Sequence, residues 1–195
     1  GTENCAFGYN ALNTSTISNL NAFGNEALEK CTTGVHNCAF GFRALEECTT
    51  GGYNTSVGNY AADDLTTGQY NTSIGYNTNG ALTTGDYSTA VGSGSLANNA
   101  GIGYNSAVGH NSLHNVTTGY SNAAIGTDAG DTLTTGQDNT YIGRGADASG
   151  NSVTFESCLG SNVTGKGSNT TNIRSHVYNT SNNSTFHTTS DIRIK

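Results

Sequence analysis

Apolar and small residues return along the chain every 17 positions. Asn54-Thr55-Ser56-Val57-Gly58 comes back as Asn71-Thr72-Ser73-Ile74-Gly75 and again as Ser88-Thr89-Ala90-Val91-Gly92. The glycine closing this motif recurs at a constant step, apart from a first step that is one position shorter, at Gly8, Gly24, Gly41, Gly58, Gly75, Gly92, Gly109, Gly126, Gly143 and Gly160. The tripeptide Thr-Thr-Gly runs in phase with it, beginning at Thr32, Thr49, Thr66, Thr83, Thr117 and Thr134. Register this strict indicates a repeat architecture.

The aligned repeats form columns of constant chemistry. The residue before the motif glycine is always bulky and apolar: Phe7, Phe23, Phe40, Val57, Ile74, Val91, Val108, Ile125, Ile142 and Leu159. One residue earlier the chain is small in the first eight copies: Ala6, Ala22, Ala39, Ser56, Ser73, Ala90, Ala107 and Ala124. The residue before Thr-Thr-Gly is apolar: Cys31, Cys48, Leu65, Leu82, Val116 and Leu133. Cys31 and Cys48 stand where later repeats have Leu, so we expect them to be buried structural thiols.

These columns predict an all-β fold. No apolar face recurs at the 3.6-residue period of a helix, and β-branched residues beside turn-forming Asn and Gly favour two or three very short strands per repeat. Stacking one repeat per layer gives a parallel β-solenoid, or β-roll, in which each column is a ladder. With a strand spacing of about 4.8 Å, nine or ten coils over residues 1–160 would make a rod roughly 45 Å long.

Oligomerisation follows from the thinness of such a rod. So short a coil encloses little volume, and its few apolar anchors cannot seal both faces. We therefore expect other copies of the chain to bury some columns, as in a parallel homotrimer whose three-fold symmetry repeats one contact in every layer. The pattern leaves open whether each chain coils on itself or three chains wind together.

Composition narrows the class of protein. The chain has 27 Gly, no Pro, no Met and no Trp, and its periodic apolar columns argue against disorder. It has no apolar run long enough to span a membrane. Its net charge is −7 and it has no basic stripe, so nucleic acid is an unsuitable partner. A surface of Asn, Thr, Ser and Gly is typical of an extracellular rod without cofactor or metal, and a start in mid-repeat suggests a segment of a longer polypeptide.

The repeats resemble those of known fibrous proteins. Phrases such as Asn71-Thr72-Ser73-Ile74-Gly75-Tyr76-Asn77 are similar to repeats of viral and phage tail fibres and, more loosely, to the head repeats of trimeric autotransporter adhesins. The resemblance covers residues 1–160 and implies a homotrimeric fibre that supports attachment to a host surface, with a host cell-surface glycan as a further partner.

The last nine residues resemble a different element of the same particles. His187-Thr188-Thr189-Ser190-Asp191-Ile192-Arg193-Ile194-Lys195 looks like the junction into the intramolecular chaperone of endosialidase-type tail spikes, which opens on Ser-Asp-x-Arg-x-Lys. That chaperone assembles the trimer and cuts itself off at the Ser-Asp bond. The resemblance implies cleavage between Ser190 and Asp191, with Ser190 as nucleophile and Lys195 as its activating base. The chain stops at Lys195, so we expect no such activity from these residues alone.

Residues 161–189 lie between the repeats and this junction and lose the regular register. Their apolar residues are widely spaced, at Ile173, Val177 and Phe186. We interpret this segment as an extended stem whose three copies wrap around one another. The predicted organisation is therefore a repeat shaft over 1–160, a trimeric stem over 161–189 and the start of a chaperone over 190–195.

Two columns carry candidate chemistry. Tyr53, Tyr70, Tyr87 and Tyr104 lie one repeat apart and should form an aromatic ladder, which either stabilises itself by stacking or offers a platform for sugar rings. Glu29, Glu46 and Asp63 form an acidic column flanked by Glu47 and Asp64. Stacked carboxylates repel and can have raised pKa values, and paired carboxylates are what a glycosidase needs, although solvated turn residues explain the column as well.

The function predicted from the sequence is structural. We expect a trimeric shaft on the surface of a virion, not an enzyme, with host recognition either in the shaft or in a neighbouring domain. A polysaccharide-degrading tail spike is the alternative from a different class, and the acidic column is the feature in its favour. A secreted trimeric adhesin is the other alternative, which a membrane anchor in the full gene would mark.

Overall fold

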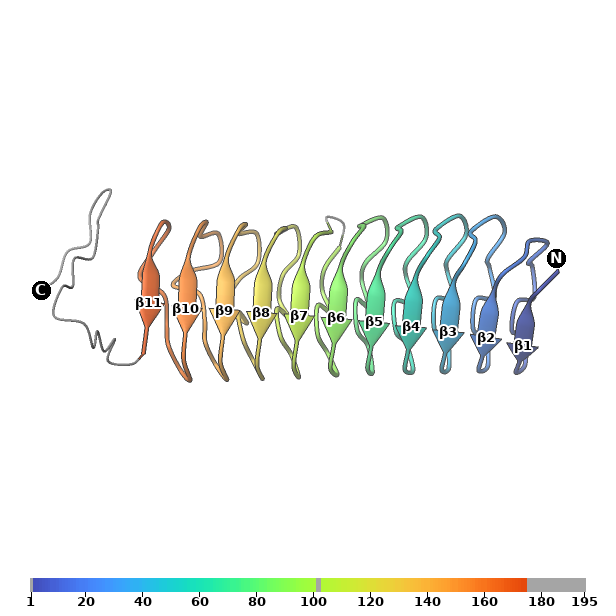
Figure 1. Ribbon diagram of the computed structural model, residues 1–195, viewed down its shortest axis with the longest axis horizontal. Coiled ribbons are helices and arrows are strands. Elements are labelled where there is room, and N and C mark those ends of the chain that lie inside the picture. Colours follow the sequence, from blue (N-terminus) through green and yellow to red (C-terminus); the bar gives the residue numbers. More distant parts are fainter. Residues whose placement is uncertain (1, 101–102, 175–195) are drawn as a thin grey trace, which may run out of the picture.

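The computed structural model describes residues 2–100 and 103–174, and it shows one straight rod (Figure 1). Successive strands lie side by side along its length, with β1 at one end and β11 at the other. All pairs are parallel, and the strands follow one another in sequence order within a single sheet. The eleven strands are β1 (Cys5–Phe7), β2 (Asn21–Phe23), β3 (Cys38–Phe40), β4 (Thr55–Val57), β5 (Thr72–Ile74), β6 (Thr89–Val91), β7 (Ser106–Val108), β8 (Ala123–Ile125), β9 (Thr140–Ile142), β10 (Ser157–Leu159) and β11 (Thr171–Ile173).

The strand register confirms the predicted solenoid. Val57 of β4 pairs with Ile74 of β5, and Ile74 pairs with Val91 of β6, so the column read from the sequence is a ladder in space. Each coil is formed by a single chain that coils on itself, which is one of the two arrangements that the sequence left open. Every layer therefore buries its small inward side chains against the layers before and after it.

The prediction of two or three strands per repeat is wrong, because each described coil holds one short named strand. Left-handed backbone conformations interrupt the rest of the coil. In the layer of β4 they occur at Tyr53 (φ 60°), Gly58 (φ 136°), Tyr60 (φ 57°) and Ala62 (φ 49°). Such residues turn the chain sharply instead of extending it. Together they fold the repeat into a compact loop with one short extended side.

The motif glycine is strict because the layers leave no room for a side chain there. At Gly58 a Cβ atom would lie 2.2 Å from the carbonyl oxygen of Gly75 in the next layer. Glycine alone adopts this φ without strain and permits the close approach of two backbones.

Buried asparagines connect the layers. The backbone N–H of Asn71 donates to Oδ1 of Asn54 at 2.9 Å, and Nδ2 of Asn71 donates to the carbonyl oxygen of Gly85 at 2.8 Å. The same pair of bonds recurs at other asparagines of the column, which joins each amide to backbone groups of the following layer. The column thereby satisfies buried backbone groups that lie outside the strand ladder.

The coil continues beyond residue 160, where the sequence led us to expect a stem. Ser157 of β10 pairs with Thr171 of β11, whereas Thr140 of β9 pairs with Ser157, so the last step is three positions shorter than the regular repeat. Residues 161–174 therefore form one further, shorter turn of the rod. The remainder of the expected stem and the junction residues Ser190, Asp191 and Lys195 lie outside the described residues.

Candidate interaction surface and neighbouring sites

Each strand presents its last residue to the outside. In β4 the central Ser56 is 1% exposed, whereas Val57 is 38% exposed, because side chains of an extended segment alternate between its two faces. The same holds in β5, where Ser73 is buried and Ile74 is 40% exposed. We call the outward ladder the apolar column: Phe7, Phe23, Phe40, Val57, Ile74, Val91, Val108, Ile125, Ile142, Leu159 and Ile173.

Several of the exposed large hydrophobic residues of the described chain belong to the apolar column. Two further groups are exposed. The tyrosines of the ladder and Phe155 stand four positions before the apolar column in the sequence, and Tyr9 and Tyr76 follow the motif glycine. Columns elsewhere on the coil, such as that of Thr50 and Thr67, expose polar side chains. A continuous apolar strip of this length is typical of a surface that contacts another molecule.

The predicted tyrosine ladder is confirmed. Ring centroids lie 4.9 Å apart between Tyr53 and Tyr70, 5.0 Å between Tyr70 and Tyr87 and 5.4 Å between Tyr87 and Tyr104. His36 extends the stack at 4.9 Å from Tyr53. Each inner ring covers the face of its neighbour, so the ladder offers ring edges and hydroxyl groups to solvent. Its role as a sugar platform stays a prediction, and the geometry favours stacking as its main contribution.

The acidic column is partly neutralised by cations of the chain itself. Carboxylate oxygens of Glu26, Glu29 and Glu46 lie within 4.8 Å of one another, which is close enough to share a metal ion. Arg43, however, contacts both Glu46 and Glu26, the latter at 3.6 Å. Lys30 lies 3.6 Å from Glu46 and also contacts Glu47. Internal ion pairs therefore offset the charges of Glu26 and Glu46, whereas Glu29 Oε1 accepts a hydrogen bond from Asn10 Nδ2 at 3.0 Å.

Asp63 is the member of the acidic column with the most altered acidity. Partial burial and the neighbouring Asp64 carboxylate raise the pKa of Asp63 to about 6. A carboxyl group that protonates near pH 6 could act as a general acid. The polysaccharide-degrading alternative retains this one feature and stays a prediction.

The cysteines match the structural role expected for them. All five are free thiols, and Cys31, Cys48 and Cys158 are buried. The hydrogen bond to Cys31 and burial raise the pKa of Cys48 well above its ordinary value. A neutral, buried thiol packs as a small apolar side chain and does not act as a nucleophile.

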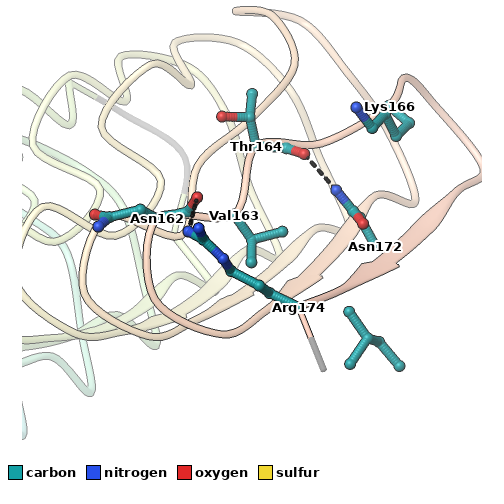
Figure 2. A pocket seen from close by; sticks show the side chains of 7 residues that line it. Asn162, Val163, Thr164, Lys166, Asn172 and Arg174 are labelled. Atoms are coloured by element: carbon teal, nitrogen blue, oxygen red, sulfur yellow. Dashed lines mark hydrogen bonds between the residues drawn. The ribbon is translucent and has the colours of Figure 1, made fainter. Parts of the chain in front are cut away.

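A hollow at the β11 end of the rod was not foreseen from the sequence. Its volume is about 400 Å³, and its lining includes Val163, Thr164, Lys166, Asn172 and Arg174 (Figure 2). Arg174 Nη1 donates to the carbonyl oxygens of Ser161 at 2.9 Å and Asn162 at 3.1 Å. The available signal was a pair of cations close together in an acidic chain, at Lys166 and Arg174. The shortened coil that brings these two cations together breaks the repeat register, so the repeat pattern did not reveal the hollow.

Comparison with protein-family models, curated protein sequences and solved structures finds no match for this chain. Within residues 2–100 and 103–174, no helix has the length and apolar character needed to cross a membrane. The class of the molecule is therefore defined by its fold, a parallel β-solenoid built by one chain.

Proposed function

We propose that the chain is the shaft of a viral or phage fibre, exposed on the virion surface, that supports attachment to a host. Its work is structural: a stack of short coils holds another element at a distance. The observation that carries the proposal is the apolar column, which remains at least partly exposed over eleven successive layers of the rod.

Parallel copies of the chain are the partner that suits this column best. Cyclic symmetry about an axis along the rod places each layer against the same layer of its neighbours. Phe40 then meets Phe40, and Ile74 meets Ile74, so side chains of equal size face one another in every layer. In an antiparallel pair the Phe-rich end near β1 would instead face the β11 end. Three copies around one axis bury a narrow column completely, and we propose the homotrimer.

Assembly is proposed to depend on the sequence that follows Lys195. There the resemblance at residues 187–195 implies a chaperone that forms the trimer and then cleaves the chain between Ser190 and Asp191. A serine hydroxyl needs a base to accept its proton, and a desolvated lysine such as Lys195 can serve. The proposal assigns no other catalytic activity to the shaft.

The test is to express the chain together with its downstream sequence and measure intact mass and light scattering. A trimer whose chains end at Ser190 supports both assembly and cleavage. Ser190→Ala is the matched control, and it should give a trimer of uncut chains. An uncut monomer from the unaltered sequence would contradict the fibre and leave a self-contained solenoid.

A further inference from the structure

We propose that the hollow at the β11 end of the rod binds an anionic saccharide, meaning a sugar ring that carries one carboxylate or sulfate group. Lys166 and Arg174 would hold the anionic group, and the polar and apolar walls would hold the ring. This inference goes beyond the structural role of the shaft. One chain supplies all the lining residues of the hollow, and one of them, Ile173, is also the last member of the apolar column.

Charge is the first argument. Lys30 and Arg43, near the other end of the rod, are both engaged by glutamates. No ion pair joins Lys166 or Arg174 to a carboxylate in the described part of the chain. Within the described residues the hollow therefore presents two cations without an ion-pair partner, on a chain with a net charge of −7. An anion is the ligand that this arrangement attracts.

A buried carboxylate holds the loop that carries Lys166 in place. Glu156 is fully buried, and its Oε1 accepts a hydrogen bond from the backbone N–H of Gly167 at 2.8 Å. Its Oε2 accepts from the N–H of Ser149 at 3.0 Å and from the hydroxyl of Tyr141 at 3.2 Å. A Cβ atom on Gly165 would lie 1.9 Å from Glu156 Oε1, so a larger residue there would displace this carboxylate from its donors.

This anchoring has two consequences for a ligand. The carboxylate of Glu156 is turned inward and accepts from Gly167 of the loop and from Ser149 and Tyr141 of the preceding coil, so it does not pair with Lys166. The loop backbone is also fixed before a ligand arrives, which lowers the entropy lost on binding.

Arg174 is fixed in a similar way and keeps donors free. A guanidinium group has five N–H donors, and the two bonds from Nη1 to carbonyl oxygens of Ser161 and Asn162 hold its plane against the preceding layer. The donors on Nε and Nη2 make no hydrogen bond within residues 2–100 and 103–174. They would serve a carboxylate or sulfate, whose oxygens suit the planar fork of arginine. Figure 2 shows this side chain extending along one wall of the hollow.

The other walls favour a sugar over a bare ion. Asn172 Nδ2 donates to the carbonyl oxygen of Thr164 at 2.6 Å, which orients the amide and leaves its Oδ1 to accept from a hydroxyl group. Val163, 4% exposed, gives an apolar floor for ring C–H groups. A volume of about 400 Å³ exceeds that of a small ion and lies in the range of ligand sites. Among the residues that the structure describes, no aromatic side chain lines the hollow for stacking a nucleobase.

The test is ligand-observed saturation-transfer NMR on the assembled protein with three probes: methyl β-D-glucuronide, glucose 6-sulfate and methyl β-D-glucoside. We expect the two anionic sugars to bind with dissociation constants in the millimolar range, and the neutral glucoside to bind at least about fivefold more weakly. Lys166→Gln should weaken the anionic sugars about fivefold or more. Arg144→Gln removes an exposed cation from another coil and should leave binding unchanged.

Several results would overturn the inference. Equal binding of glucoside and glucuronide would exclude recognition of the anionic group. Competition by acetate or inorganic sulfate at the same concentration as the sugars would mean that the hollow binds bare anions. Equal weakening by Arg144→Gln would mean that the overall electrostatic field of the rod attracts the anionic sugars. Absence of a saturation-transfer signal with all three probes would exclude the site.

Discussion

Leu65 and Ile74 are both apolar, and both belong to columns that recur along the rod, yet they have opposite surroundings. Leu65 is completely buried by coils of its own chain, whereas Ile74 is 40% exposed on the outer side of the strand. The inner columns therefore stabilise the solenoid, and the apolar column is the surface at which we propose a contact between molecules. Changes in the first should alter unfolding, and changes in the second should alter association.

The largest expected effect is on the stacking of the coils. Gly58→Ala would force a side chain into the carbonyl group of Gly75 and impose a φ that alanine avoids. We expect the free energy of unfolding to fall by at least roughly 3 kcal/mol, measured by chemical denaturation. Gly150→Ala is the control, because its Cβ would meet nothing closer than 3.9 Å. Equal losses at both positions would refute the packing argument.

The inner column is tested by shortening one of its leucines. Leu65→Ala leaves a cavity between layers and should lower the free energy of unfolding by about 2–5 kcal/mol. Ile74→Ala is the matched change on the outside and should cost less than about 1 kcal/mol in a dissociated chain. If Ile74→Ala cost as much as Leu65→Ala in the dissociated chain, the distinction between the two columns would fail.

A charged residue in the apolar column tests the difference between the inner columns and the apolar column more strictly. Ile74→Lys would place three ammonium groups near one axis in the proposed trimer, and burying unpaired charges is strongly unfavourable. We expect dissociation to monomers that keep their far-ultraviolet circular dichroism, detected by sedimentation velocity. Thr67→Lys adds the same charge to an exposed polar position of the coil and should leave the assembly intact. Equal dissociation by both variants would contradict the proposed interface.

The tyrosine ladder should contribute a smaller, graded amount. Tyr70 stacks on Tyr53 and Tyr87, whereas Tyr104 has a stacked ring partner on one side only among the described residues. Tyr70→Ser should therefore cost about 1–2 kcal/mol and Tyr104→Ser about half as much, since each aromatic pair contributes roughly 0.5–1.5 kcal/mol. Thermal and denaturant unfolding of the two variants would measure the difference. A larger cost at Tyr104 would contradict pairwise stacking.

The smallest effect concerns pH. The pKa of Asp63 is raised to about 6 in the folded chain, against about 4 when unfolded. Folding therefore favours the protonated group: this stability is present below pH 4 and is lost as pH rises towards 6. Because Asp63 is only half-buried, solvent screening limits the effect to on the order of 1 kcal/mol.

Asp63→Asn should remove this slope and stabilise the rod slightly at pH 7. Urea midpoints measured from pH 4 to pH 7 would show it, with Asp138→Asn, a matched change at an exposed site, as control. An unchanged slope in Asp63→Asn would show that other groups cause the pH dependence.

The sequence predicted the ladder at Val57, Ile74 and Val91, because a period of constant length leaves one parallel register. It did not predict one strand per coil, since Tyr60 and Ala62 are not residue types that favour the left-handed conformation they adopt. The coil that ends in β11 was missed because its shorter step breaks the period. The hollow depends on that coil and on the buried carboxylate of Glu156, which stands at the register of Asn122 and Asn139 and replaces their amide.

The central claim is that the apolar column lies at an axis shared by several copies of the chain. Double electron–electron resonance tests it most directly, with one spin label at position 74 or 67 in chains whose native cysteines are replaced by alanine. The account predicts dipolar coupling in both samples and shorter distances between labels at position 74 than at position 67. Absence of coupling at both positions, or shorter distances at position 67, would contradict it.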